Sequence, residues 1–131
     1  MIDTFIAKVK TQMGLLRQKA HALETQMQSD ASTYELSADT CVDLWKRNKE
    51  IDKVRNEIMG CQFIIEFHPQ IEAQALKGYD WAHVDAGSHI EYGNAIVNDY
   101  IEFLKSVGFK AKFKHDHNNS TFEVTWGNQQ I

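Results

Sequence analysis

The sequence predicts an α+β fold, in which a long antiparallel helical hairpin of coiled-coil type is followed by a short helix, one amphipathic helix and a C-terminal β-hairpin. Two stretches, residues 2–27 and 41–65, carry apolar residues at steps of three and four, which is the period of a helix. Within 109–126, two runs alternate apolar and polar residues, as strands do. One proline and seven glycines among 131 residues also favour long regular elements.

The first helix is expected from residue 3 or 4 to about residue 28. Its apolar residues follow steps of four and three without a break: Ile2, Ile6, Val9, Met13, Leu16, Ala20, Leu23 and Met27. This heptad pattern is typical of a helix that packs against one narrow partner. The partner is expected to be the next helix.

The second helix is expected over residues 38–67, with the turn formers of 29–37 before it. A short connection favours antiparallel neighbours, so Met27 is expected opposite Thr40, and Ile2 opposite Ile65. The helix should end near His68, because the residue before a proline is disfavoured in the α region. These elements form a first part, residues 1–68.

A second part, residues 69–131, is expected as one compact unit or packed against the first. Pro69 would open a short helix that Gly78 ends, and 79–87 would form a loop. Ser88 and Glu91 match a capping box and would start an amphipathic helix over 88–107, which Gly108 ends. A β-hairpin over 109–126 then turns between residues 115 and 120.

The two cysteines predict a reducing compartment. Cys41 and Cys61 lie twenty residues apart on one expected helix, about 30 Å at 1.5 Å per residue, too far for a disulfide. Both are expected on the buried seam as unreactive thiols, so no catalytic residue is predicted there. No leader peptide or membrane-spanning run is apparent, and a cytoplasmic protein is expected.

The charge pattern argues against nucleic acid as a partner. The net charge is −4, and the one basic row is formed by Lys105, Lys110, Lys112 and Lys114. No aromatic residue is expected on the face of the strand that carries Lys110, Lys112 and Lys114, so a platform for stacking bases is not predicted. These lysines are candidate ligands for an acidic partner or a phosphate, although edge-strand lysines often only prevent aggregation.

Aromatic residues around the expected loop give a second candidate binding group. Tyr79, Trp81 and Tyr92 are of the types that are enriched at binding hot spots. The alternative interpretation is that they only pack between helices.

The same region carries a candidate metal site. His83, Asp85 and His89, together with His115 or His117, offer the imidazole and carboxylate ligands that divalent transition metals bind. The alternative is that these residues are solvated loop residues. Apart from this possible divalent metal, no cofactor is predicted.

These features predict a non-enzymatic protein-interaction module that binds a protein partner and forms homo-oligomers. It would act as an adaptor, an inhibitor or an assembly subunit, for example a mobile-element protein that blocks a host protein. The alternative hypothesis is a protein that binds a small ligand or a metal in a pocket around residues 79–92 and the lysine-bearing strand.

Overall fold

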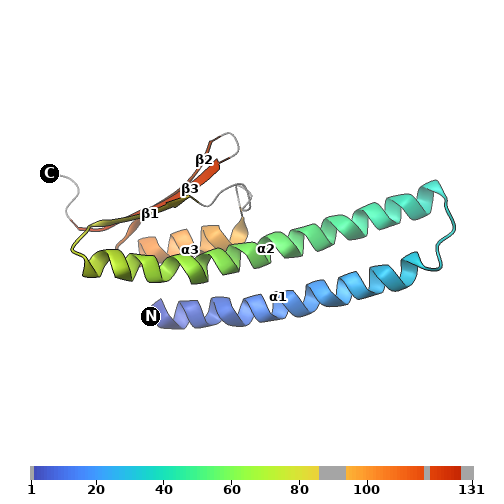
Figure 1. The fold of residues 1–131 in the computed structure, drawn as a ribbon, viewed down its shortest axis with the longest axis horizontal. Helices are drawn as coiled ribbons and strands as arrows, with labels where there is room; N and C mark the ends of the chain where they lie inside the picture. Colours follow the sequence, from blue (N-terminus) through green and yellow to red (C-terminus); the bar gives the residue numbers. More distant parts are fainter. Residues whose placement is uncertain (1, 86–93, 117–118, 128–131) are drawn as a thin grey trace.

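The computed structural model describes residues 2–85, 94–116 and 119–127. Two long helices, one short helix and a three-stranded antiparallel sheet follow in the order α1 (Ile2–Ala31), α2 (Ala38–Leu76), β1 (Trp81–Asp85), α3 (Ala95–Ser106), β2 (Lys110–Asp116) and β3 (Asn119–Thr125) (Figure 1). The predicted α+β fold with its antiparallel helical hairpin and C-terminal β-hairpin is confirmed.

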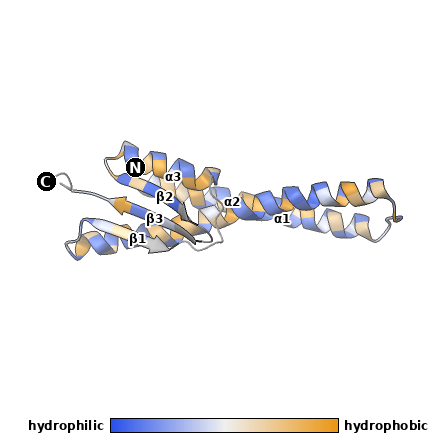
Figure 2. Ribbon diagram, turned by 90° about the horizontal axis from the view of Figure 1, so that it is seen from above, coloured by the Kyte–Doolittle hydropathy of each residue, from blue (hydrophilic) through white to orange (hydrophobic). Residues whose placement is uncertain are grey.

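The molecule divides into a head and an arm. The head (residues 2–16, 56–85, 94–116 and 119–127) contains every member of the main hydrophobic cluster, from Val9 of α1 to Val124 of β3. The arm (residues 17–55) is the distal part of the hairpin, where α1 and α2 run side by side beyond the sheet (Figure 2). Only Ala20, Ile51 and Val54 are fully buried there. The arm is therefore a bare pair of helices on a well-packed head.

Aromatic rings fill the centre of the head. The fully buried Phe122 of the central strand lies 4.9 Å from Phe67 and 5.4 Å from Phe63 of α2, measured between ring centroids. It also lies 5.7 Å from Tyr100 of α3 and 6.3 Å from Phe113 of β2. Phe122 thus joins the sheet to both helices beneath it.

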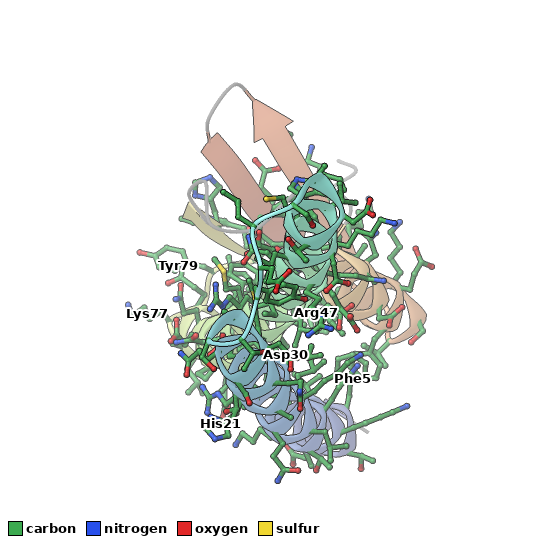
Figure 3. The ribbon with its side chains drawn as sticks, turned by 90° about the vertical axis from the view of Figure 1, so that its right-hand side faces the viewer. Phe5, His21, Asp30, Arg47, Lys77 and Tyr79 are labelled. Atoms are coloured by element: carbon green, nitrogen blue, oxygen red, sulfur yellow. The ribbon has the colours of Figure 1, made fainter. Side chains whose placement is uncertain are left out.

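The helical hairpin has a different register from the predicted one. Arg55 of α2 contacts Glu24 of α1 at 2.5 Å, and Arg47 pairs with Asp30 near the tip, where Figure 3 shows the two residues facing each other. Met27 therefore lies beside Ile51 rather than Thr40. The turn comes later in the chain than predicted, because α1 runs on to Ala31, and Tyr34 in the connection donates a hydrogen bond to Asp43 in the second turn of α2.

Helix α2 continues through Pro69, so the predicted break at His68 and the separate short helix after it are wrong. Proline inside a helix costs about 3 kcal/mol, because it removes one hydrogen bond and crowds the preceding turn. Here the buried face runs on through Ile64, Phe67 and Ile71, at steps of three and four. Burying these side chains against the sheet offsets the cost.

The predicted loop at 79–87 contains a strand. Gly78, with φ of +87°, ends α2 in the left-handed conformation, as expected, and the Tyr79 N–H donates to the carbonyl of Gln74. The chain then turns into β1, which pairs antiparallel with β3 to give the strand order β1-β3-β2. The β-hairpin thus gains its third strand from the same chain.

Helix α3 begins at Ala95, later than the predicted start at Ser88. Asn94 is the N-cap: it is 4% exposed, and its side-chain oxygen accepts hydrogen bonds from the N–H groups of Ile96 and Val97. Its amide donates to the carbonyl of Asn56 in α2, at 2.9 Å. The predicted capping residues Ser88 and Glu91 lie outside the described residues. The helix ends as predicted, at Gly108 with φ of +99°.

The cysteines are both free thiols, but only one is buried. Cys61 belongs to the core, where loss of hydration, together with the nearby Glu57, raises its thiol pKa to about 11. Cys41 is exposed, contrary to the prediction that it lies on the buried seam. None of the described helices has the length and apolar character that a membrane span requires.

The contact between Asn94 and Gly60 gives a sharp test of how α3 is fixed to α2. In Gly60→Ala, the added Cβ would lie 2.6 Å from Oδ1 and 2.9 Å from Nδ2 of Asn94, so the cap must move. We expect the free energy of unfolding, measured by urea denaturation, to fall by about 1–3 kcal/mol.

Gly14→Ala is the matched control, because an added Cβ there meets no atom within 4 Å. This helix-interior substitution should raise the free energy of unfolding by up to about 1 kcal/mol. If Gly60→Ala were as stabilising as Gly14→Ala, the described packing of Asn94 would be wrong.

Candidate binding surface

The pairing of the three strands builds one outer sheet face that points away from the helices. Residues directly opposite each other on antiparallel strands point to the same side, and the register gives three rows across the sheet. They are Trp81–Thr125–Lys110, His83–Glu123–Lys112 and Thr121–Lys114. The opposite side chains, including Ala82, Val124 and Ala111, are buried against the helices. We call these three rows the outer sheet face.

Charges on this face are partly paired. Glu123 lies between two lysines, with carboxylate–ammonium distances of 3.4 Å to Lys112 and 3.6 Å to Lys114. Its slight burial raises its pKa, but the two lysines more than compensate, so the net pKa is lowered. Such exposed pairs contribute about 0–1 kcal/mol to stability. Their main effect is to hold the lysine side chains over the sheet.

An aromatic pair occupies one corner of the surface. Tyr79 and Trp81 are 49% and 45% exposed, and their ring centroids are 5.7 Å apart. The adjacent Leu76, at the end of α2, is 82% exposed. Gln74 donates a hydrogen bond to the Trp81 carbonyl, and Trp126 donates its N–H to the Asp80 carbonyl. These backbone anchors fix the corner although its side chains face solvent.

The prediction that no aromatic residue shares the lysine face is wrong. Trp81 lies in the same row as Lys110, two strands away and therefore about 10 Å distant at the usual strand spacing. The error follows from the missed strand, because β1 is what brings Trp81 onto the sheet. Of the other candidate residues, Lys110, Lys112 and Lys114 are all exposed on β2, and Tyr92 lies outside the described residues.

The predicted metal ligands are only partly described. His83 is exposed on β1, and Asp85 follows two residues later on the same strand, while His89 lies outside the described residues, as does His117. In the part of the chain that the structure describes, no three His, Cys, Asp or Glu residues are grouped as metal ligands would be. The metal site stays a prediction.

The arm carries a second set of exposed apolar residues. Trp45 is 60% exposed and Leu36 is 93% exposed near the tip, and Val42 lies one turn before Trp45 on the same helix. By contrast, Phe5 of the head stacks on Phe103 at 4.3 Å. The C-terminal part therefore covers Phe5 in the head, whereas Leu15 of α1, at 61% exposed, and the arm residues stay open to solvent.

A groove runs between the two helices of the arm. It has a volume of about 270 Å³ and is lined by Glu24, Met27, Gln28, Ala31, Asn48, Ile51 and Arg55. Asn48 of α2 is exposed here. The groove marks a face on which the two helices do not close over each other.

One titratable pair lies inside the head. His68 Nδ1 is 3.0 Å from the hydroxyl of Tyr100, which is completely buried. Burial lowers the pKa of His68, opposed by Asp3 and Glu72, and burial also raises the pKa of Tyr100. The pair therefore favours a neutral imidazole that accepts a hydrogen bond from the tyrosine. Phe5 stacks on Tyr100 with their ring centroids 6.0 Å apart, so the histidine–tyrosine pair is part of the core.

Comparisons with known proteins add no functional assignment: no protein-family model, no curated protein and no solved structure matches the chain.

The His68–Tyr100 pair predicts a pH dependence of stability. Because the pKa of His68 is lower in the folded chain than in the unfolded one, the unfolded chain binds the extra proton first as the pH falls. The contribution of neutral His68 to the free energy of unfolding is therefore complete above about pH 6.5, the pKa of an unfolded histidine. It is lost as the pH falls from there through the lower pKa of His68 in the folded chain. Thermal denaturation between about pH 7.5 and pH 5.5 measures it.

His68→Gln should shrink the decrease in melting temperature over this pH range. His21→Gln is the control, since His21 is exposed on α1 and should leave the decrease unchanged. An identical pH profile for His68→Gln and the parent protein would refute the assignment of the dependence to His68.

Proposed function

We propose that the protein is a non-enzymatic interaction module that binds a partner protein through the outer sheet face. The observation that carries the proposal is the common row of Trp81, Thr125 and Lys110, which combines an exposed aromatic corner with a lysine strand. Tryptophan, tyrosine and charged groups around them are the usual make-up of binding hot spots. Because β1 and β3 are tied to the core, the face is preorganised and loses little freedom on binding.

A protein partner suits this face better than nucleic acid. Glu123 lies between Lys112 and Lys114 and partly neutralises their charge. A phosphate backbone favours an uninterrupted basic stripe, and this chain has a net charge of −4. A mixed surface of aromatic, threonine, lysine and glutamate side chains instead supports hydrogen bonds and ion pairs with another protein.

The proposal includes assembly of several copies through the arm. The groove between α1 and α2 has apolar residues at its floor, Met27 and Ile51 among them. Helical hairpins commonly complete their core by pairing into four-helix bundles. Asn48 lines the groove, and a polar residue between packed helices can fix their register in such bundles.

Binding without catalysis suits an adaptor, an assembly subunit or an inhibitor of another protein, such as a mobile-element product that blocks a host protein. The free thiols of Cys41 and Cys61 support a reducing compartment such as the cytoplasm.

Site-specific photo-crosslinking tests the partner-binding surface. Thr125 replaced by the photoreactive benzoylphenylalanine lies between Trp81 and Lys110 and should yield a discrete crosslinked protein in cells. The same replacement at Gln12, exposed on α1, should not. The double variant Trp81→Ala with Lys112→Glu should lower the yield about tenfold or more, since it removes a hot-spot ring and reverses a charge.

Trp45→Ala with Lys46→Glu makes the same pair of changes on the arm and should leave the crosslink intact. Equal losses from the two double variants, or no product specific to position 125, would contradict the proposed surface.

Native mass spectrometry tests assembly through the arm. We expect masses at multiples of the 15.1 kDa protomer. Gln28→Arg places a charge at the groove and should shift the distribution toward the protomer, whereas Thr25→Arg, exposed on the same helix but not lining the groove, should not. A parent protein that is a protomer at micromolar concentration would rule out this mode of assembly.

A further inference from the structure

Among the described residues, β2 pairs with β3 alone, because the strand order is β1-β3-β2, so its second edge has no partner strand in this part of the chain. Its seven residues, Lys110–Asp116, span about 23 Å at the usual rise of a strand. Every second residue of such an edge directs its N–H and C=O groups outward, where another extended chain can pair with them.

A groove follows this second edge of β2. It lies between β2 and α3, has a volume of about 340 Å³ and is lined by Asn98, Ile101, Glu102 and Lys105 of α3 and by Ala111, Lys112 and Phe113 of β2. Figure 2 shows α3 running along that side of β2. The volume is at the lower end of the range of about 300–1,000 Å³ for ligand clefts. An extended peptide can occupy the space between a strand and a neighbouring helix.

The floor and the rim of the groove differ in chemistry. Ile101 and Phe113 are half-buried and offer apolar surface toward the groove. Among the described side chains that line the groove, follow it along β2 or pair with these residues, four are positive (Lys105, Lys110, Lys112 and Lys114) and two are negative (Glu102 and Glu123). Lys105 pairs with Glu102 at 3.7 Å, and Lys112 and Lys114 share Glu123. The edge therefore keeps a local excess of positive charge on a chain whose net charge is −4.

This excess decides which chain can pair with β2. A second copy that added its own β2 would bring two lysine rows together, and like charges opposite each other on a sheet are destabilising. An acidic strand would instead meet Lys110, Lys112 and Lys114 on the outer side and Lys105 on the helix side. The lysines that prevent self-pairing are also the complement of an acidic partner.

We propose that the groove between α3 and β2 binds an acidic, extended peptide segment of the partner, which adds to the sheet as a fourth strand along β2. This deepens the proposed function, on which it rests, by naming the chemistry of the bound segment. Alternate residues of the peptide point to opposite faces of the sheet. The best ligand therefore alternates acidic residues, placed over the lysines, with small apolar residues, placed over Ile101 and Phe113.

Peptide titration followed by fluorescence anisotropy tests the proposal on the full chain. The probe is a labelled nonapeptide in which glutamate alternates with valine, and the reference is a nonapeptide of the same composition with its glutamates and valines in two blocks. We expect the alternating peptide to bind at least tenfold more tightly, and its affinity to fall with added salt because exposed charges are screened.

Backbone pairing has its own readout. N-methylation of every second peptide bond removes either the N–H groups that face β2 or those that face solvent, depending on which set is methylated. One set should abolish binding and the other should retain it, as strand addition requires. If both methylated peptides bind equally well, the peptide is not a fourth strand and the proposal fails.

Matched variants locate the peptide. Asn98→Trp fills the groove from an exposed position of α3 and should reduce affinity at least tenfold, whereas Ser106→Trp, exposed on the same helix outside the groove, should not. In amide NMR spectra, the peptide should shift the signals of residues 101 and 110–114. Shifts centred on Trp81 instead, or no binding of the alternating peptide, would overturn the groove proposal.

The photo-crosslink from position 125 separates the two proposals. If the peptide does not bind but the crosslinked partner persists, only the groove is wrong. If the peptide binds as expected while no crosslink forms, the groove stands as a peptide site and the partner surface on the outer sheet face is wrong.

Discussion

The contact of Phe122 with aromatic rings on three other elements holds the head together. Phe122 lies on the central strand, and its neighbours come from α2, α3 and β2. Each aromatic pair contributes about 0.5–1.5 kcal/mol beyond the area it buries. Because this cluster seals the inner face of the sheet, the outer face is left to solvent, and both the aromatic corner and the lysine strand acquire fixed positions.

The elements that repeat a clear pattern could be predicted from the sequence, and those decided by contacts between distant residues could not. Heptad steps predicted both long helices, and alternation predicted β2 and β3. The start of α3 depends on Asn94 reaching Asn56 across α2, in the space that Gly60 leaves. The passage of α2 through Pro69 depends on burying Phe67 and Ile71. Neither contact produces a recognisable residue pattern in the local sequence.

The residues of the candidate binding surface were predicted in separate groups. Lysines on β2 and the ring of Trp81 were both candidates on grounds of residue type. Their union on one face needs the register that pairs Trp81 with Thr125 and Thr125 with Lys110. A five-residue strand such as β1 has too few residues for a reliable period, and it forms because β3 offers it an edge. The groove between α3 and β2 likewise could not be predicted from the sequence, because it depends on how α3 packs beside the sheet.

The continuity of α2 has a geometric consequence. One uninterrupted helix of 39 residues connects the exposed Trp45, near the tip, to the exposed Leu76 beside the aromatic corner. At 1.5 Å per residue these two positions are about 46 Å apart along the helix axis. The second half of this helix is fixed by its burial against the sheet and α3. Insertion or removal of one helical turn in α2 would therefore change the distance between these two exposed groups by about 5.4 Å without changing the residues of either.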